Sequence, residues 1–298
     1  MNSFMFKPAV QSLQCVHQGK VRDTFAIPFQ PHLLLVVATD RVSTHNIVHE
    51  STIPLKGQAL TALTVFWMEQ QFKDINTHLF VSGEAIYQYL PAGTYPPDLH
   101  HRAVIVEKLE MIPIEFIFRS RMAGSLWKDF YSKGLQNPYE IDLPTGLTLM
   151  SPFEESIFTP TDKSDTDDPL KAEEIVLFYP EAYLLARKVY ERGRAFAATK
   201  GIEIIDGKFE MGFNREGEVV LADECLTPDS CRFVRADEIV VGKEPSWLDK
   251  QHVREEAERM WNGGKKAPLT FSEKVCAETS ARYGELVQAF TGFPLEVF

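Results

Sequence analysis

The chain has 298 residues, a length that suits one large α/β unit or about two domains. Its 31 Lys and Arg residues against 42 Asp and Glu residues give a net charge of −11, which works against general affinity for nucleic acid or anionic membrane surfaces. The N-terminus "MNSFMFKPAV" lacks the basic region and apolar run of a signal peptide, and no stretch is long and apolar enough to cross a bilayer. The four cysteines are widely spaced and include no CxxC pair, so we expect buried thiols in a reduced, cytoplasmic protein: Cys15, Cys225, Cys231 and Cys276.

The first part of the chain is predicted to be rich in strands. Apolar, β-branched runs predict strands at 33–38, 79–81, 103–107 and 114–118. Between the first two, "QALTALTVFWMEQQF" has apolar residues at helical spacing, which predicts a helix packed on the core.

A polar loop, 159–174, follows these strands. Its clustered Asp, Ser, Thr and Pro residues leave two interpretations open: a solvated connector, or a lid that closes over a ligand. After it, "EAYLLARKVYERGRAFAATKG" predicts a long amphipathic helix that closes at Gly201, and the strand "IEIID" comes next. A charged hairpin and a helical tail containing "DKQHVREEAERMW" complete an α/β or α+β plan typical of enzymes.

The charged hairpin, "DGKFEMGFNREGEVVLAD", carries the strongest chemical signal. Asp206, Lys208 and Glu210 alternate along a strand and therefore share a face. With "NREG" as the turn, Phe213 would pair with Glu218, which sets Lys208 opposite Asp223 and Glu210 diagonally from Asp223, about 7 to 8 Å away.

Two carboxylates so close repel each other unless a cation lies between them. Glu210 and Asp223 suit Mg²⁺, which is usually held by one or two carboxylates together with nucleotide phosphates, and Lys208 would complement a phosphate. The alternative is a surface hairpin with an ordinary cross-strand salt bridge. Asp206 is either a supporting carboxylate or a hydrogen-bond acceptor at a strand end.

Two further segments could hold phosphate. "HQGKVRDTF" places Gly19 and Lys20 at a tight turn with Arg22 two residues on, although the Walker A pattern GxxxxGK[ST] is absent. "RSRMAGSLWKDF" sets Arg119 and Ser125 beside small residues that precede a helix, which favours an anion site at the helix N-terminus.

Polar groups also follow two other predicted strands. "ATDRVSTHN" presents Asp40 and Arg41 directly after an apolar strand, either for a ligand or as an internal ion pair. "TPDSCRF" ends a loop with Asp229 and Arg232, which could bind a phosphate or a carboxylate. The sequence contains no GxSxG or HExxH motif.

Seven motifs, in their order and approximate spacing, resemble the SAICAR synthetase family, the phosphoribosylaminoimidazole-succinocarboxamide synthases of purine biosynthesis. They are "GKVRD", "TDRVS", "IPLKGQALTALTVFW", "RSRMAGSLWKDF", "IFTPTDK", "DGKFEMGF" and "LADECLTPDSCRF". The resemblance implies an ATP-dependent carbon–nitrogen ligase that joins L-aspartate to the carboxylate of carboxyaminoimidazole ribonucleotide and releases ADP and phosphate.

The resemblance also implies an architecture. It is an α+β fold with an N-terminal nucleotide-binding lobe, residues 1–118, similar to the ATP-binding lobe of protein kinases. A second α/β domain with the helical tail, residues 119–298, follows, and ATP lies between the two. The oligomeric state stays open.

By position, the resemblance assigns roles to the candidate residues. Gly19, Lys20, Arg22 and Lys208 are implied to contact ATP, and Glu210 and Asp223 to hold Mg²⁺. Lys208, Glu210 and Asp223 are thus the catalytic group. The implied substrate-binding residues, with the cradle for the ribonucleotide's 5′-phosphate among them, are Asp40, Arg41, Arg119, Ser125, Asp229 and Arg232.

The chain departs from the family pattern at two places. Thr44, His45 and Asn46 stand where the family commonly has Ala, an aromatic residue and Asp, and Val234 replaces an aromatic residue. Two rival functions remain: a kinase-like phosphotransferase that shares the ATP and Mg²⁺ site, and a nucleotide-sensing module without turnover.

Overall fold

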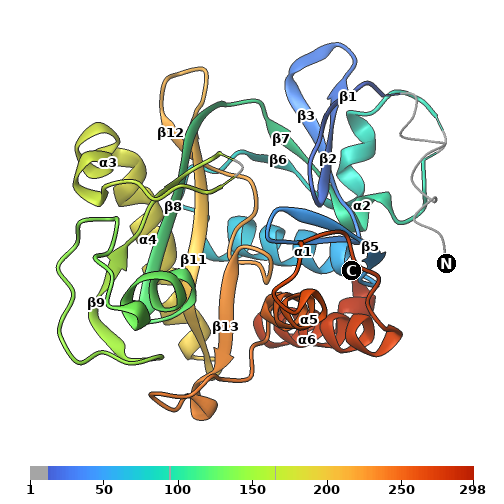
Figure 1. Ribbon diagram of the computed structural model, residues 1–298. Coiled ribbons are helices and arrows are strands. Elements are labelled where there is room, and N and C mark those ends of the chain that lie inside the picture. The colour runs from blue at the N-terminus through green and yellow to red at the C-terminus, as the bar shows by residue number, and fades with distance from the viewer. Residues whose placement is uncertain (1–12, 94, 165) are drawn as a thin grey trace. The chain divides into compact units, whose positions relative to one another are not determined.

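The chain folds into two units, each built on its own antiparallel sheet (Figure 1). A computed structural model describes residues 13–93, 95–164 and 166–298. The stretch "MNSFMFKPAV", for which the sequence predicts no targeting segment, lies outside the described residues. The units are Met1–Leu109 with Lys250–Phe298, and Glu110–Asp249. Among the described residues, no helix is both long and apolar enough to cross a membrane.

The first unit contains a five-stranded sheet in the order β1-β2-β3-β7-β6. Along β3, Leu33, Leu35 and Val37 are buried on alternate positions, because one face of the sheet packs on the core. Two short helices, η3 (Gly83–Gln88) and α2 (Leu99–Arg102), supply further residues to this core. The strands are β1 Cys15–Gln18, β2 Arg22–Ile27, β3 Gln30–Ala38, β6 Leu79–Val81 and β7 Ala103–Glu107.

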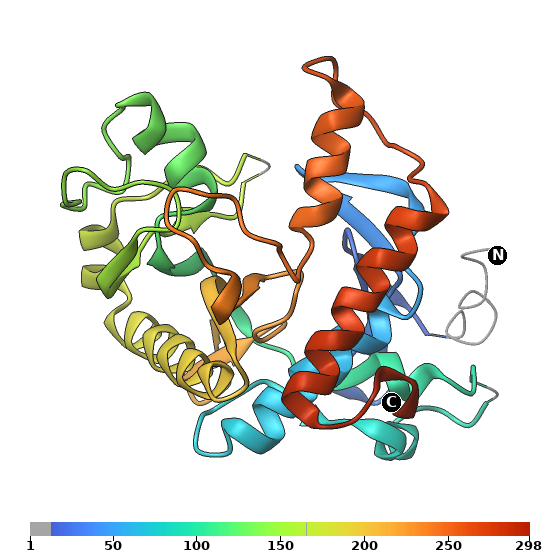
Figure 2. The ribbon, with the colours of Figure 1, turned by 90° about the horizontal axis from the view of Figure 1, so that it is seen from below.

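The C-terminal helices belong to this first unit, and their positions can be followed in Figure 2. Helix α6 (Glu273–Thr291) packs on α1 (Lys56–Val65) and on its π-helical continuation η2 (Phe66–Gln71). The rings of Trp67 and Phe290 lie 5.2 Å apart in an edge-to-face contact. The last helical turn of the chain is η7 (Leu295–Val297), which contacts α1 and α6.

Helix α5 (Gln251–Trp261) packs against the two-stranded ribbon of β4 (Arg41–Thr44) and β5 (Ile47–Thr52). Trp261 and Phe271 join Val42 and Ile53 in one apolar cluster. The sequence-based division, which put the tail with the second domain and the boundary at residue 118, is therefore corrected. The tail groups with the first unit because its apolar side chains are buried there.

The second unit contains a sheet in the order β10-β8-β11-β12, with β9 paired to β8 and β13 paired to β11. Helix α4 (Pro180–Ala198) packs against β8, β11 and β12. On α4, Tyr190 is fully buried and its hydroxyl donates to the carbonyl oxygens of Ile204 and Ile205, at 3.1 and 3.0 Å. The strands are β8 Glu110–Arg121, β9 Pro152–Phe158, β10 Thr161–Asp162, β11 Ile202–Phe213, β12 Val219–Ala222 and β13 Cys231–Arg235.

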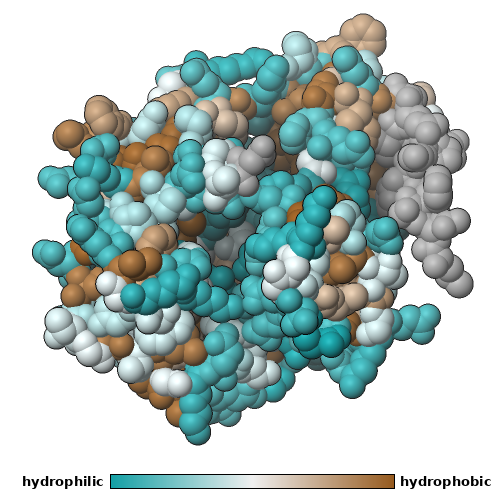
Figure 3. Space-filling model, viewed as in Figure 1, coloured by the Kyte–Doolittle hydropathy of each residue, from teal (hydrophilic) through white to brown (hydrophobic). Residues whose placement is uncertain are grey.

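Short helices complete the second unit: η4 Leu126–Phe130, η5 Tyr131–Lys133, α3 Ala172–Phe178 and η6 Ala236–Glu238. On the face drawn in Figure 3, hydrophobic residues gather where α3 lies, and Leu177 and Phe178 are 74% and 68% exposed.

The predicted elements are confirmed where apolar periodicity was strong. The strands at 79–81 and 103–107 are β6 and β7, and the two predicted helices are α1 with η2, and α4. "IEIID" and the first hairpin strand form one continuous strand, β11, rather than two elements.

Candidate active site

The charged hairpin forms, but its register differs by one residue from the prediction. Phe213 pairs with Val219, and Glu210 pairs with Ala222. The reason is the turn: Asn214 pairs with Glu218 through the backbone, and its side-chain oxygen accepts from the N–H groups of Glu216 and Glu218, at 3.1 and 2.8 Å. The loop therefore has three residues, and it closes on Gly217 at φ +79°.

This register removes the predicted pairing of Lys208 with Asp223. The regular strand ends at Ala222, and Asp223 adopts a left-handed conformation at φ 56°, which is uncommon outside glycine although aspartate adopts it more readily than most residues. Asp223 nevertheless acts on the predicted partners, because its charge raises the pKa values of both Lys208 and Glu210. The convergence of the three groups thus arises from a backbone turn, whereas the sequence predicted a cross-strand pair.

A cluster of alternating charges surrounds these residues, and the sequence interpretation missed two of its charged members, Glu115 and Lys163. Lys208 forms an ion pair with Glu115 on β8, and Lys163 forms one with Glu210. The hydroxyl of Thr161 donates to the other oxygen of Glu115 at 2.9 Å. Glu115 is only 7% exposed, and a glutamate within the apolar strand "IEFIF" was the signal that could have identified it.

The charged residues of this site are called the acid–lysine cluster: Glu115, Lys163, Lys208, Glu210 and Asp223. The pKa shifts of Lys208 and Glu210 show how its charges are balanced. Burial and the charge of Asp223 raise the pKa of Glu210, and this effect outweighs the opposing charges of Lys163 and Lys208. Burial alone would lower the pKa of Lys208, but the carboxylates of Glu115 and Glu210 raise it instead. Lys208 therefore stays protonated. The carboxylates of Glu210 and Asp223 repel each other, so a further cation close to them would be stabilising.

Asp206 lies two residues before Lys208 on the same strand and holds two arginines. Its Oδ2 atom accepts from Arg119 Nη1 at 3.1 Å and from Arg232 Nη1 at 2.5 Å. Asp206 and Arg119 are 5% and 3% exposed. The charges of Asp249 and Glu244 also act on Arg232. Guanidinium groups match the oxygens of carboxylates and phosphates in geometry, so two of them side by side suit an anion.

The neighbouring loop completes this arginine pair. Gly124, at φ +60°, has no space for a side chain, because a β-carbon there would lie 2.6 Å from Arg232 Nη1 and 3.0 Å from Arg119 Nη1. Arg119 donates through Nη2 to the hydroxyl of Ser125 at 3.3 Å and through Nε to Thr159 at 2.9 Å. Helix η4 begins just after Ser125 and has only five residues, so the predicted contribution of a helix dipole is small.

Asp229 and Val234 lie on either side of Arg232. Asp229 is 9% exposed in the turn before β13, where its backbone N–H donates to the hydroxyl of Thr227 at 3.3 Å. Val234 is fully buried and packs with Ile205 and Trp247. An aliphatic residue therefore fills the core at the position where the family commonly has an aromatic one.

The polar loop is partly built into this site. Its start, Thr159 and Thr161, is buried and bonds to Arg119 and Glu115, and Lys163 reaches Glu210. Further along, Asp162 accepts from the N–H groups of Ser164 and Asp168. That the loop closes as a lid stays a prediction.

In the first unit, the turn between β1 and β2 carries Gly19, Lys20 and Arg22. Gly19 N–H donates to Arg22 O at 2.7 Å, and a β-carbon on Gly19 would lie 2.8 Å from that oxygen. Lys20 Nζ donates to the side-chain oxygen of Asn46 at 2.5 Å. His45 and Asn46 form a two-residue turn at φ 50° and 62°. Two of the three residues at which the chain departs from the family pattern therefore build the turn of the β4–β5 hairpin.

Asp40 and Arg41 both have partners within the first unit. Asp40 Oδ1 accepts from Gly57 N–H at the start of α1, at 2.9 Å, and from the buried Arg102 Nη1, at 3.1 Å. Arg41 bonds to Asp23 and to the turn at Gly19 and Lys20. The sequence left an internal ion pair open as an alternative, and each residue forms one: Asp40 with Arg102, and Arg41 with Asp23.

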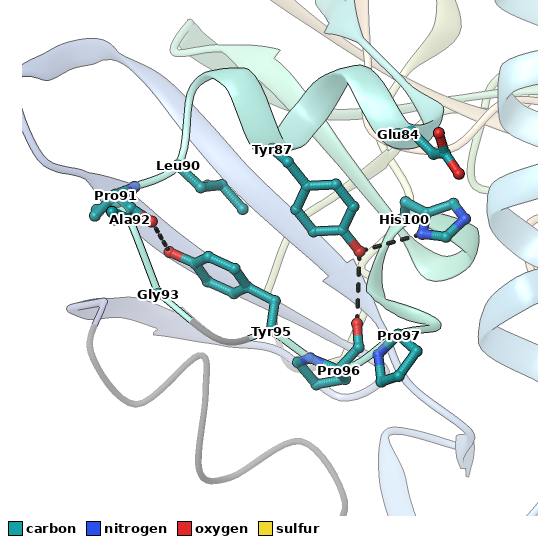
Figure 4. Close-up of a pocket in the computed structure, with 10 residues that line it drawn as sticks. All are labelled: Glu84, Tyr87, Leu90, Pro91, Ala92, Gly93, Tyr95, Pro96, Pro97 and His100. Carbon is teal, nitrogen blue, oxygen red and sulfur yellow. Dashed lines mark hydrogen bonds between the residues drawn. The ribbon is translucent and has the colours of Figure 1, made fainter.

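A separate hollow of about 460 Å³ lies in the first unit between η3 and α2 (Figure 4). The hydroxyl of Tyr95 donates to Pro91 O at 2.9 Å, and the hydroxyl of Tyr87 lies 3.1 Å from His100 Nδ1. None of its described lining residues is one of the predicted site residues.

The donor set of the second unit fits a divalent cation bound through few protein ligands. No group of three or more His, Cys, Asp or Glu side chains among the described residues could enclose a metal by itself. Glu210 and Asp223 provide two carboxylates, and burial together with the charge of Asp223 raises the pKa of Glu210. Such a pair suits Mg²⁺, whose remaining ligands are usually phosphates and water.

The fold and site define an α+β enzyme whose second unit groups an arginine pair and an acid–lysine cluster around strand β11. Comparisons with known proteins agree. The SAICAR synthetase family model matches residues 15–269. A phosphoribosylaminoimidazole-succinocarboxamide synthase of Desulfotalea psychrophila is 36% identical over 301 residues, covering 98% of this chain and 100% of that protein. The Saccharomyces cerevisiae protein of that name is 36% identical over 299 residues, covering 94% and 95%.

A solved structure gives the same result. The SAICAR synthase from Saccharomyces cerevisiae, complexed with SAICAR, superposes with a TM-score of 0.82 at 33% identity, covering 95% of this chain and 96% of that one. The chain belongs to the SAICAR synthetase family. The predicted α+β fold of that family is confirmed, and the chain is a ligase of purine biosynthesis.

Proposed function

We propose that the protein joins L-aspartate to the carboxylate of carboxyaminoimidazole ribonucleotide in an ATP-dependent reaction in the cytoplasm, giving SAICAR, ADP and phosphate. Family membership over nearly the whole chain supports this reaction. The observation that carries it in the structure is strand β11, where Asp206, Lys208 and Glu210 alternate. Two residues of an extended strand span about 7 Å, so Asp206, which holds the arginine pair, and Lys208, in the acid–lysine cluster, are about that far apart along β11.

The arginine pair is proposed to bind the 5′-phosphate of the ribonucleotide. Arg119 and Arg232 share the carboxylate of Asp206, and their guanidinium groups lie beside Ser125 and the close-packed Gly124. Guanidinium groups match phosphate oxygens in geometry, and rigid anchoring lowers the cost of ordering them on binding.

The acid–lysine cluster is proposed to act on the ATP phosphates. Glu210 and Asp223 would hold Mg²⁺, which supplies charge neutralisation to the nucleotide phosphates when bound. Lys208 would contact a phosphate through an ammonium group that Glu115 keeps charged and oriented. In the first unit, Gly19, Lys20 and Arg22 are proposed as further phosphate contacts.

The chemical task is the activation of a carboxylate, whose oxygen is a poor leaving group. We expect an oxygen of the substrate carboxylate to attack the γ-phosphorus of ATP, so that the bond from phosphorus to the bridging oxygen breaks and ADP leaves. The neutral amine of aspartate then attacks the acyl phosphate carbon, loses a proton and expels inorganic phosphate. This chemistry requires positioning and charge stabilisation from the protein more than covalent help.

The test is a substrate-omission experiment with product analysis. Purified protein with Mg²⁺ and ATP should release phosphate only when both the imidazole ribonucleotide and aspartate are present, and mass spectrometry should detect SAICAR. Phosphate transfer to an alcohol without aspartate would indicate a kinase-like phosphotransferase instead. ATP binding without any turnover would indicate a nucleotide-sensing module.

A further inference from the structure

Arg41 makes a dense set of contacts beneath the turn that carries Gly19 and Lys20. Its Nη1 and Nη2 atoms donate to the two carboxylate oxygens of Asp23, at 3.0 and 2.7 Å. Its Nη2 atom also donates to Gly19 O at 2.9 Å, and its Nε atom to Lys20 O at 3.2 Å. Four hydrogen bonds thus engage a guanidinium group that has five N–H donors.

All four carbonyl oxygens of the turn have partners inside the first unit. Arg41 binds those of Gly19 and Lys20. The carbonyl of Val21 accepts from the N–H and the hydroxyl of Thr39, at 2.9 and 2.8 Å, and that of Arg22 accepts from Gly19 N–H. The turn is therefore fixed through its carbonyl groups, and Arg41 supplies the contacts at its first two residues.

We propose that Arg41 is a positioning residue for this turn, anchored by Asp23, and that it is not a contact for the ribonucleotide or aspartate. The inference rests on the proposed function only where it assigns the turn to the ATP phosphates. Arg41 holds the backbone carbonyl groups of Gly19 and Lys20, and so it fixes the backbone position from which the Lys20 side chain extends. The carboxylate of Asp23 fixes the guanidinium plane that does this.

The chemistry of the side chain explains why arginine stands here. A planar guanidinium group can satisfy a carboxylate with two N–H groups and reach two carbonyl oxygens with others at the same time. A lysine ammonium group keeps the charge but offers no such fork. We call the bonds from Arg41 to the carbonyl oxygens of Gly19 and Lys20, with the Asp23 pair that orients them, the brace. Arg41→Lys tests the brace without removing the positive charge. Asp23→Asn tests the ion pair with Arg41 while keeping one acceptor oxygen.

The experiment measures the Kd of Mg·ADP by calorimetry and the KM values of all three substrates. We expect Arg41→Lys and Asp23→Asn each to raise the Kd of Mg·ADP and the KM of ATP about tenfold, the change that one charge-assisted hydrogen bond gives. The KM values of the ribonucleotide and aspartate should stay within about twofold. The Kd of Mg·ADP for the double variant should be no higher than that for Arg41→Lys alone, because both changes break the same brace.

Arg121→Lys is the matched control. In the second unit, Arg121 makes the same kind of contact, with two bonds to Glu203 at 2.7 and 3.0 Å and one to Met150 O at 3.0 Å. This variant should lower the melting temperature about as much as Arg41→Lys and leave the Kd of Mg·ADP unchanged. An equal rise in that Kd would mean that loss of any braced arginine weakens binding, and would overturn the inference.

Other outcomes decide the remaining alternatives. A raised KM for the ribonucleotide or aspartate, with ATP unaffected, would make Arg41 a substrate contact, and additive effects in the double variant would refute the shared brace. If Arg41→Lys does not fold, Asp23→Asn alone carries the test. If wild type binds Mg·ADP but makes no SAICAR, the proposed function fails while the Kd comparison still tests the brace.

Discussion

Two groups of charged side chains in the interior of the second unit form a pair and a triad. Glu115 with Lys208, and Asp206 with Arg119 and Arg232, each balance charges that would be costly to bury alone. Glu210 differs, because burial and Asp223 raise its pKa although Lys163 binds it. At the scale of single residues, Glu210 is therefore the group whose charge most requires a further cation.

Glu210→Gln should leave the protein folded and reduce kcat by about 10² to 10³-fold, since removal of a group that stabilises transition-state charge costs that much. The glutamine keeps the shape of the side chain and still accepts a hydrogen bond from Lys163. The measurement is steady-state phosphate release at saturating substrates, with the melting temperature as the check on folding.

Glu216→Gln provides the control for this change. Glu216 lies exposed in the three-residue loop of the same hairpin, so this variant loses the same charge without touching the cluster. Its kcat should match that of wild type. Normal kcat in Glu210→Gln would remove Glu210 from the proposed metal site.

At the scale of elements, two helical glycines differ in the space that helix packing leaves for a β-carbon. Gly193 lies in α4, where an added β-carbon would meet Leu226 Cδ1 at 2.2 Å, and Leu226 is itself fully buried. Gly284 lies in α6, and the nearest atom to a β-carbon there is Leu295 Cβ at 3.9 Å, an ordinary contact.

Gly284→Ala should therefore stabilise the protein by about 0.5 to 1 kcal/mol, because alanine costs less backbone entropy in a helix. Gly193→Ala gains the same propensity but overpacks the core, so it should destabilise by about 1 to 3 kcal/mol. Urea unfolding of both variants measures the two signs. A stabilised Gly193→Ala protein would show that α4 does not pack on Leu226 as described.

At the scale of the whole molecule, stability in acid depends on histidines that tie the C-terminal segment to the β4–β5 ribbon. His49 is 5% exposed, and its Nδ1 accepts from Leu269 N–H at 3.2 Å, so Nε2 carries the proton and donates to Thr44 at 2.8 Å. Burial, and then the charge of His45, lower the pKa of His49 below 6.5.

The sign of the pH dependence follows from this direction. The unfolded chain takes up a proton on His49 as the pH falls through about 6.5, while the folded protein does not, so the free energy of unfolding decreases below that pH. The loss ends only below the lowered pKa of the folded state. His45 and His252 also have lowered pKa values, chiefly through burial, and add to the same trend.

His49→Gln should therefore lose less stability than wild type between about pH 7 and pH 5, even though it starts from a lower value. The quantity to compare is the shift of the urea midpoint between the two pH values. His17→Gln, at an exposed position on β1, should keep the wild-type shift. An unchanged shift in His49→Gln would show that His49 is not held neutral in the fold.

The sequence by itself determined the family, most strands and helices, and the residue types of the site, because these depend on local periodicity and ordered motifs. It predicted that Lys208 and Glu210 share a face, since alternation along a strand is a local property, and it placed Asp223 near them through a hairpin register that is one residue off. Only the tertiary structure decided how Asp223 reaches them, which carboxylate holds Arg119 and Arg232, and that Glu115 and Lys163 complete the cluster. Contacts between β8, β11 and the polar loop join residues far apart in sequence, and the pairing of C-terminal helices with the first unit does the same. Such contacts depend on how buried surfaces fit together, and no local pattern encodes that fit.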